Sequence, residues 1–77
     1  MYVDLASLNE TLVAASLPVA GVAWTTCAEA RDAYIPTGPC MWCCLPGGDV
    51  RIDLTEDLDE AETLLAVGIV DAWGGGI

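Results

Sequence analysis

The four cysteines are the residues whose type and spacing could support chemistry in this chain. Three of them lie within the five-residue stretch CMWCC, and the fourth lies further upstream. Four thiolates are enough for an all-cysteine zinc site, although such sites normally combine two separated C-x-x-C pairs. A zinc-stabilised binding module is therefore one hypothesis. Its ligands would be Cys27, Cys40, Cys43 and Cys44.

Strand geometry favours a different role for these thiols. The stretch 40–45 has the composition of a β-strand, in which side chains alternate between the two faces. Cys43 and Cys44 would then point to opposite faces, so that one ion could not bind both. Cys40 and Cys44 would share a face but lie about 13 Å apart, too far for a disulfide. Because cysteine packs well as a small apolar residue, we expect buried structural thiols, with zinc binding and redox use as alternatives.

The charged residues are few and strongly unbalanced. Twelve acidic residues accompany two arginines, with no lysine or histidine, so the 77 residues carry a net charge of −10. Direct binding to nucleic acid is not expected, because it requires clusters of Lys or Arg against the phosphates. Histidine is the most common general base, and its absence argues against an enzyme. This composition favours a protein that binds other proteins.

Seven of the twelve carboxylates lie between residues 49 and 62. They can form a solvated turn followed by a well-capped helix start, which is the common role of a charge run. They can alternatively form an anionic patch that docks on a basic protein surface. The seven residues are Asp49, Asp53, Glu56, Asp57, Asp59, Glu60 and Glu62.

Patterns along the chain predict an α+β fold in a single domain over residues 1–77. Leucines at helical spacing predict an N-terminal helix capped by Asp4. Enrichment in Val, Trp and Thr predicts a strand over 19–26, in which Gly21 marks a bulge or a close approach. A short helix is expected over 28–34, before a proline- and glycine-containing loop.

The clearest local signal is a hairpin over residues 40–54. Two strand-like runs flank the turn-forming sequence PGGD at 46–49. In the second run, Val50, Ile52 and Leu54 alternate with charged residues, which is typical of a strand with one buried face. We therefore expect a small antiparallel sheet, made of this hairpin and strand 19–26, packed with an N-terminal and a C-terminal helix.

The C-terminal helix is expected over about residues 58–73, with Asp57 as its N-cap and Glu60 in its first turn. Its predicted core-facing residues are Leu58, Ala61, Leu65, Ile69 and Ala72. The other side of the helix is also largely apolar, and a domain this short can hardly cover both sides. We therefore expect burial against another chain. The predicted interface residues are Leu64, Val67, Val70 and Trp73.

Neither a secretory signal nor a membrane span is expected. The chain does not open with a basic segment followed by a short apolar core. The uncharged stretch 11–28 contains Pro18 and Gly21 and has no basic flank, which is untypical of a transmembrane helix. The thiols are then expected to stay reduced.

Two parts of the sequence carry a resemblance to a known group of proteins. The first comprises LNETL at 8–12 and AASLPVAGV at 14–22, and the second comprises GDVRIDL at 48–54 and AVGIVDAW at 66–73. Together they resemble small proteins of tailed-phage genomes, often encoded near tail genes, with the motifs LPV-x-GV, G-x-V-R-I-D and IVDAW. The resemblance covers about half the chain and does not include the cysteines.

The resemblance implies a phage origin and a role in the virion or in tail assembly, without catalysis. The leading hypothesis is a non-enzymatic accessory component of the virion, most of all of the tail, which needs no cofactor and contacts other virion subunits or itself. Its expected location is the virion or the host cytoplasm. One alternative is an acidic DNA mimic that inhibits a host nucleic-acid-binding machine, as anti-CRISPR proteins do. The zinc-stabilised module is the other.

Overall fold

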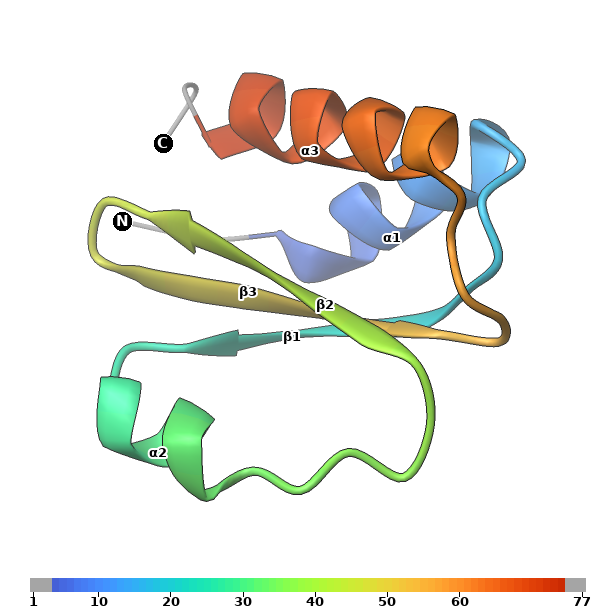
Figure 1. Ribbon diagram of the computed structural model, residues 1–77. Helices are drawn as coiled ribbons and strands as arrows, with labels where there is room; N and C mark the ends of the chain where they lie inside the picture. Colours follow the sequence, from blue (N-terminus) through green and yellow to red (C-terminus); the bar gives the residue numbers. More distant parts are fainter. Residues whose placement is uncertain (1–3, 75–77) are drawn as a thin grey trace.

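Three strands and three helices make up the chain in a computed structural model that describes residues 4–74. The strands form one antiparallel sheet in the order β1-β3-β2, and α1 and α3 cover the same face of it (Figure 1). The predicted α+β fold, a hairpin plus one strand packed with an N-terminal and a C-terminal helix, is confirmed. In chain order the elements are α1 (Leu5–Ala14), β1 (Val19–Thr25), α2 (Ala28–Ala33), β2 (Cys40–Leu45), β3 (Gly48–Leu54) and α3 (Glu60–Gly74).

Helix α1 begins where the sequence predicts. The Asp4 carboxylate accepts hydrogen bonds from the backbone N–H of Ser7 at 3.1 Å and from its hydroxyl at 2.7 Å. Both bonds lower the pKa of Asp4, and the bond from the hydroxyl has the larger effect. Leu8 and Leu12 are fully buried on the inner side of the helix. The helix ends before Ser16, whose left-handed backbone (φ 65°) redirects the chain toward β1.

Strand β3 lies at the centre of the sheet and shows the predicted alternation. Val50, Ile52 and Leu54 are buried beneath the helices, and the charged residues between them point to the other face. On one side β3 pairs with β1, where the register shifts between Val19 and Gly21. That shift confirms the predicted irregularity at Gly21. On the other side β3 pairs with β2 without interruption.

The hairpin between β2 and β3 is tighter than the sequence predicts. Leu45 pairs with Gly48, so that only Pro46 and Gly47 form the turn. Gly47 has φ +90°. A positive φ is required at the position after the proline of a type II turn, and it favours glycine. A Cβ atom on Gly48 would lie 2.5 Å from the Thr25 carbonyl oxygen and 2.9 Å from Cζ2 of Trp24. Glycine at position 48 therefore allows the end of β1 to pack against the hairpin.

Helix α3 has a different N-cap from the predicted one. The backbone N–H of Glu62 donates to the Asp59 carboxylate at 2.7 Å, and the N–H of Asp59 donates to the Glu62 carboxylate at 3.1 Å. This reciprocal arrangement is a capping box. The prediction of Asp57 as the cap is therefore wrong, and the helix begins at Glu60, two residues later than expected.

The predicted core-facing side of α3 is also wrong in part. Ala66 and Val70 are buried, and Ile69 and Trp73 pack against the core beside them. Of the predicted residues, Leu58 and Ile69 do pack against the core. Ala61, Leu65 and Ala72 are instead exposed. Because the helix is apolar almost all round, residue spacing could not determine which side faces the sheet.

The core lies between the helix-covered face of the sheet and the two longer helices. It draws on every element except α2, which crosses the opposite face of the sheet on the way from β1 to β2 (Figure 1). None of the helices within residues 4–74 is long and apolar enough to cross a membrane. The buried residues are Leu8, Leu12, Leu17, Cys43, Val50, Ile52, Leu54, Ala66 and Val70.

Candidate functional site

The four thiols do not come together. The pairing of β2 with β3 places Cys43 opposite the buried Val50, and Cys40 and Cys44 opposite residues of the other face. This confirms the predicted division of the cysteines between two faces. Cys43 alone is buried, whereas Cys44 and Cys27 are exposed, contrary to the expectation of burial. Within residues 4–74, no three potential ligand side chains are grouped so as to hold a metal ion.

Cys43 is held as a neutral, apolar group. Burial raises the pKa of its thiol, and the nearby Asp71 carboxylate raises it further. A nucleophilic or metal-binding cysteine requires the opposite, a thiolate stabilised at neutral pH. The geometry therefore assigns Cys43 to the packing of the core.

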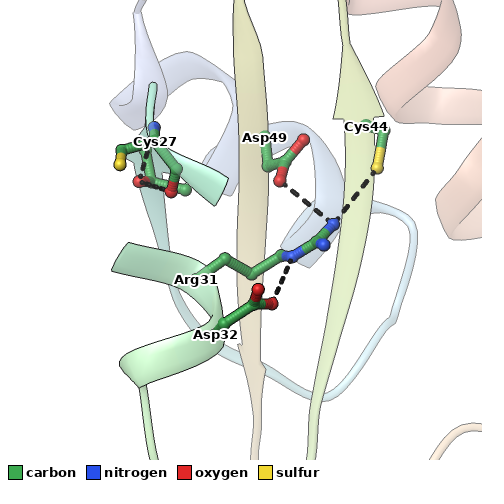
Figure 2. A network of polar contacts seen from close by, with 6 residues as sticks. Cys27, Arg31, Asp32, Cys44 and Asp49 are labelled. Atoms are coloured by element: carbon green, nitrogen blue, oxygen red, sulfur yellow. Dashed lines mark hydrogen bonds and ion pairs between the residues drawn. The ribbon is translucent and has the colours of Figure 1, made fainter. Parts of the chain in front are cut away.

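The sheet face that α1 and α3 leave uncovered, here called the second face, carries both arginines of the chain. The Arg31 guanidinium lies 3.4 Å from the Asp49 carboxylate, 3.5 Å from that of Asp32 and 3.8 Å from the Cys44 sulfur (Figure 2). Arg51 pairs with Asp53, with 3.1 Å between its Nε and a carboxylate oxygen. Each arginine thus neutralises a carboxylate of the central strand.

The Tyr34 side chain joins this second face to the connection between α2 and β2. Its ring lies edge-on to that of Trp42, with 6.0 Å between centroids, and beneath the guanidinium of Arg51. Its hydroxyl donates to Asp53 at 3.4 Å. The second face is therefore a network of paired charges and aromatic rings that fixes the crossover, and sequence spacing gave no sign of it.

This pairing divides the seven predicted acidic residues. Asp49 and Asp53 belong to the second face, and the Asp49 side chain is only 16% exposed. Glu62 is half-buried and occupied by the cap of α3. The other four are exposed, and neither arginine among the described residues pairs with them. These four residues, here called the acidic loop, are Glu56, Asp57, Asp59 and Glu60.

The predicted apolar interface is likewise divided. Val70 is 0% exposed and Trp73 packs against the core, so these two residues are corrected from interface to core positions. Leu64 and Val67 do lie on the surface, 67% and 36% exposed, and Leu65, which was predicted to face the core, is 46% exposed. The exposed apolar side of α3 is here called its outer face. It consists of Ala61, Leu64, Leu65, Val67, Gly68 and Ala72.

Carboxylates border this outer face. Asp71 is exposed on the same helix, and the acidic loop, whose last member Glu60 is the first residue of the helix, lies at its N-terminal end. Within the described residues both guanidinium groups are engaged on the second face of the sheet, beyond the core. The outer face of α3 is therefore an apolar surface with a rim of uncompensated negative charge.

Comparisons of the chain with protein-family models, with curated proteins and with solved structures find no match.

Proposed function

We propose that the chain is a non-enzymatic accessory structural protein of a phage virion, most of all of the tail, which docks on a neighbouring subunit through the outer face of α3. The exposure of Leu64, Leu65 and Val67 on one helix is the observation that carries the docking mode. The assignment to a virion rests on the resemblance of residues 8–22, 48–54 and 66–73 to tailed-phage proteins.

The energetics favour such a contact. Moving a leucine side chain from water into an apolar environment contributes roughly 1.5–3 kcal/mol. The outer face offers two leucines and a valine, together with small residues that allow a partner to approach the helix closely. A helix that lays an apolar side into a groove is a common mode of protein recognition. The outer face suits this mode.

The charges around the outer face indicate the chemistry of the partner. Two copies of α3 packed on each other would bring the uncompensated Glu60 and Asp71 carboxylates together, which opposes self-association at this surface. A groove with apolar walls and a Lys- or Arg-rich rim would complement both features. We therefore propose that the subunit docked here is a different virion protein with a basic rim.

The test uses particles purified from the phage that encodes the chain. Leu64→Asp should reduce the amount of the chain in these particles at least tenfold by quantitative immunoblotting, because a charge would be buried in the interface. Ile35→Asp is the matched control, since Ile35 is 83% exposed and belongs to the connection on the other side of the sheet. Circular dichroism should show both variants folded.

Equal incorporation of the Leu64→Asp and Ile35→Asp variants would refute docking through α3. Absence of the wild-type chain from purified particles would refute a role in the virion altogether. The position of the gene relative to tail genes provides a separate check of the same assignment.

A second candidate is an acidic DNA mimic that inhibits a host nucleic-acid-binding machine. The acidic loop favours it, because four exposed carboxylates occur within five residues without a cationic partner among the described residues. Glu56→Gln with Asp57→Asn should then abolish competition with duplex DNA for such a target, and added salt should weaken it. If Leu64→Asp abolishes binding and the neutralised variant does not, this candidate is excluded.

A further inference from the structure

The distribution of charge over the sheet is the reverse of the usual one. Edge strands normally carry charged residues that prevent pairing with other chains, whereas central strands are apolar. Here the central strand β3 carries Asp49, Arg51 and Asp53, and neither edge strand carries any charged residue. The strand β2 contains only cysteine, methionine, tryptophan and leucine.

Of the two edge strands, β2 is the one whose outer side suits pairing with another strand. The β1 edge is interrupted by its irregularity at 19–21, and bulges of this kind blunt an edge. The register of β2 is regular from Cys40 to Leu45. The N–H of Leu54 donates to the carbonyl of Pro39, and hydrogen-bonded pairs alternate along an antiparallel ladder. The backbone groups of residues 40, 42 and 44 therefore point away from β3, toward the edge of β2 that no other strand of residues 4–74 occupies.

The charges beside this edge distinguish a second copy of the chain from other partners. The net charge of −10 opposes self-association over most of the surface. Next to β2, however, Asp49 is paired with Arg31 and Asp53 with Arg51. Within residues 4–74, both arginines form these ion pairs with the strand next to β2. At the β2 edge the two carboxylates of the neighbouring strand β3 are thus already paired with cations, so two copies can meet there without bringing these carboxylates together unpaired.

We propose that two copies of the chain associate through their β2 strands, which pair antiparallel about a two-fold axis and join the two sheets into one. Residues that face each other across a continuous sheet must have their side chains on the same face. The two-fold axis must therefore lie level with a residue of β2, so that this residue faces its own copy, and not level with the midpoint between two residues. An axis at Trp42 places Cys40 opposite Cys44 of the second copy. This register alone uses the free backbone groups of residues 40, 42 and 44 in both chains.

This association does not depend on the proposed virion role, and each can fail without the other. A two-fold axis perpendicular to the sheet leaves both α3 helices on the same side of the joined sheet. The dimer would thus present two outer faces in one direction. It also gives the cysteine-rich strand a role other than metal binding, because its uncharged side chains do not oppose pairing with a second strand.

Size-exclusion chromatography with light scattering on the full chain tests the dimer. Under reducing conditions we expect a mass of about twice the 8.0 kDa of one chain. Cys44→Pro should return the mass to that of the monomer, because it removes a backbone donor from the free edge. Proline is tolerated at such outward-facing edge positions, and Cys44 is exposed. Cys44→Lys, which adds a charge to the edge, should have the same effect.

Two controls locate the contact. Cys44→Ser retains the backbone donor and should remain dimeric, and Leu64→Asp alters α3 alone and should also remain dimeric. A monomeric wild-type chain would overturn the proposal. So would a dimer that survives both Cys44→Pro and Cys44→Lys with native circular dichroism, or one that Leu64→Asp dissociates.

Thiol oxidation tests the register. The Cα separation of a hydrogen-bonded antiparallel pair, about 5.5 Å, lies within the range of disulfides, and the Cβ atoms must approach each other by about 1 Å for the bond to form. Diamide should therefore produce a covalent dimer, as each pair of thiols gives two protons and two electrons to the reagent. Cys27→Ser and Cys43→Ser should still cross-link, whereas Cys40→Ser with Cys44→Ser should not. A dimer that cross-links through Cys43, or not at all, would overturn the Trp42-centred register.

Discussion

The guanidinium carbon of Arg51 lies 4.1 Å from the centroid of the Tyr34 ring. The same guanidinium pairs with Asp53, to which the Tyr34 hydroxyl also donates. The central strand and the crossover connection are thereby joined through one planar cation and one carboxylate. Because the Arg51 and Asp53 side chains are only 25% and 33% exposed, this cluster is held more rigidly than an ion pair in open solvent.

The stability of the fold should depend on the planar shape of the Arg51 guanidinium as well as on its charge. Arg51→Lys keeps the charge but loses the stacked guanidinium, and we expect the free energy of unfolding to fall by about 1 kcal/mol. Arg31→Lys is the matched control, since Arg31 stacks on no ring within residues 4–74 and its replacement should cost less. Urea denaturation measures both. Equal losses for the two variants would contradict a specific role for the contact with Tyr34.

Gly48 should tolerate no side chain. Gly48→Ala would place Cβ against Trp24 and the carbonyl of Thr25, and we expect a loss of roughly 1–3 kcal/mol, as for other overpacked sites. Gly21→Ala provides the comparison, because a Cβ there meets nothing within 4 Å. Thermal unfolding of both variants should show a lowered Tm for Gly48→Ala alone. A similar Tm for the two would argue against the close approach.

The N-cap of α3 can be tested by comparing two neighbouring aspartates. Asp59→Ala removes the acceptor for the Glu62 N–H and should cost about 1 kcal/mol of stability. Asp57→Ala, at the cap position that sequence spacing suggests, should change stability by less than about 0.5 kcal/mol. Chemical denaturation with far-ultraviolet circular dichroism measures both, and the reverse order of effects would place the cap at Asp57.

Alkaline pH should destabilise the fold through Cys43. Burial raises the pKa of this thiol in the folded chain above its ordinary value of 9.0. The unfolded chain therefore releases the proton first, and the stability that is complete below pH 9.0 is lost as the pH rises toward the folded pKa. Urea denaturation should show stability falling above about pH 9, and more steeply in the wild type than in Cys43→Ala. Parallel pH profiles would contradict this account.

Two residues of the predicted interface should respond to aspartate in opposite ways. Val70→Asp buries a carboxylate in the core and should cost on the order of 3 kcal/mol or more, a large part of the stability of a small domain. Leu64→Asp exposes its new charge to water and should leave the isolated chain as stable as the wild type. Thermal denaturation distinguishes them, and a folded Val70→Asp variant of native stability would contradict the assigned rotation of α3.

Local patterns determined much of the fold. The alternation of Val50, Ile52 and Leu54 requires a strand with one buried face, and the Pro-Gly turn pairs it with the strand before it. Asp4 caps α1, and the leucines of that helix share one side because its other sides are more polar. In these segments each pattern involves residues that are only a few positions apart, and such patterns can be read from the sequence alone.

The division of the cysteines was also determined locally. Once 40–45 is a strand, the parity of the residue numbers assigns Cys43 to one face and Cys44 to the other. Which of these faces would be covered was not determined, because both are apolar. Only the packing of α3 made Cys43 the buried one and left Cys44 beside Arg31.

The tertiary structure decided the surfaces. The apolar residues of α3 extend almost all round the helix, so its rotation depended on which residues fit the sheet and α1. That fit buried Val70 and Trp73 and exposed Leu65. The strand order β1-β3-β2 likewise brought residues 18 positions apart, Arg31 and Asp49, into contact. The physical reason is the same in both cases, because composition states how much apolar or acidic surface exists, and only packing selects the part that remains exposed.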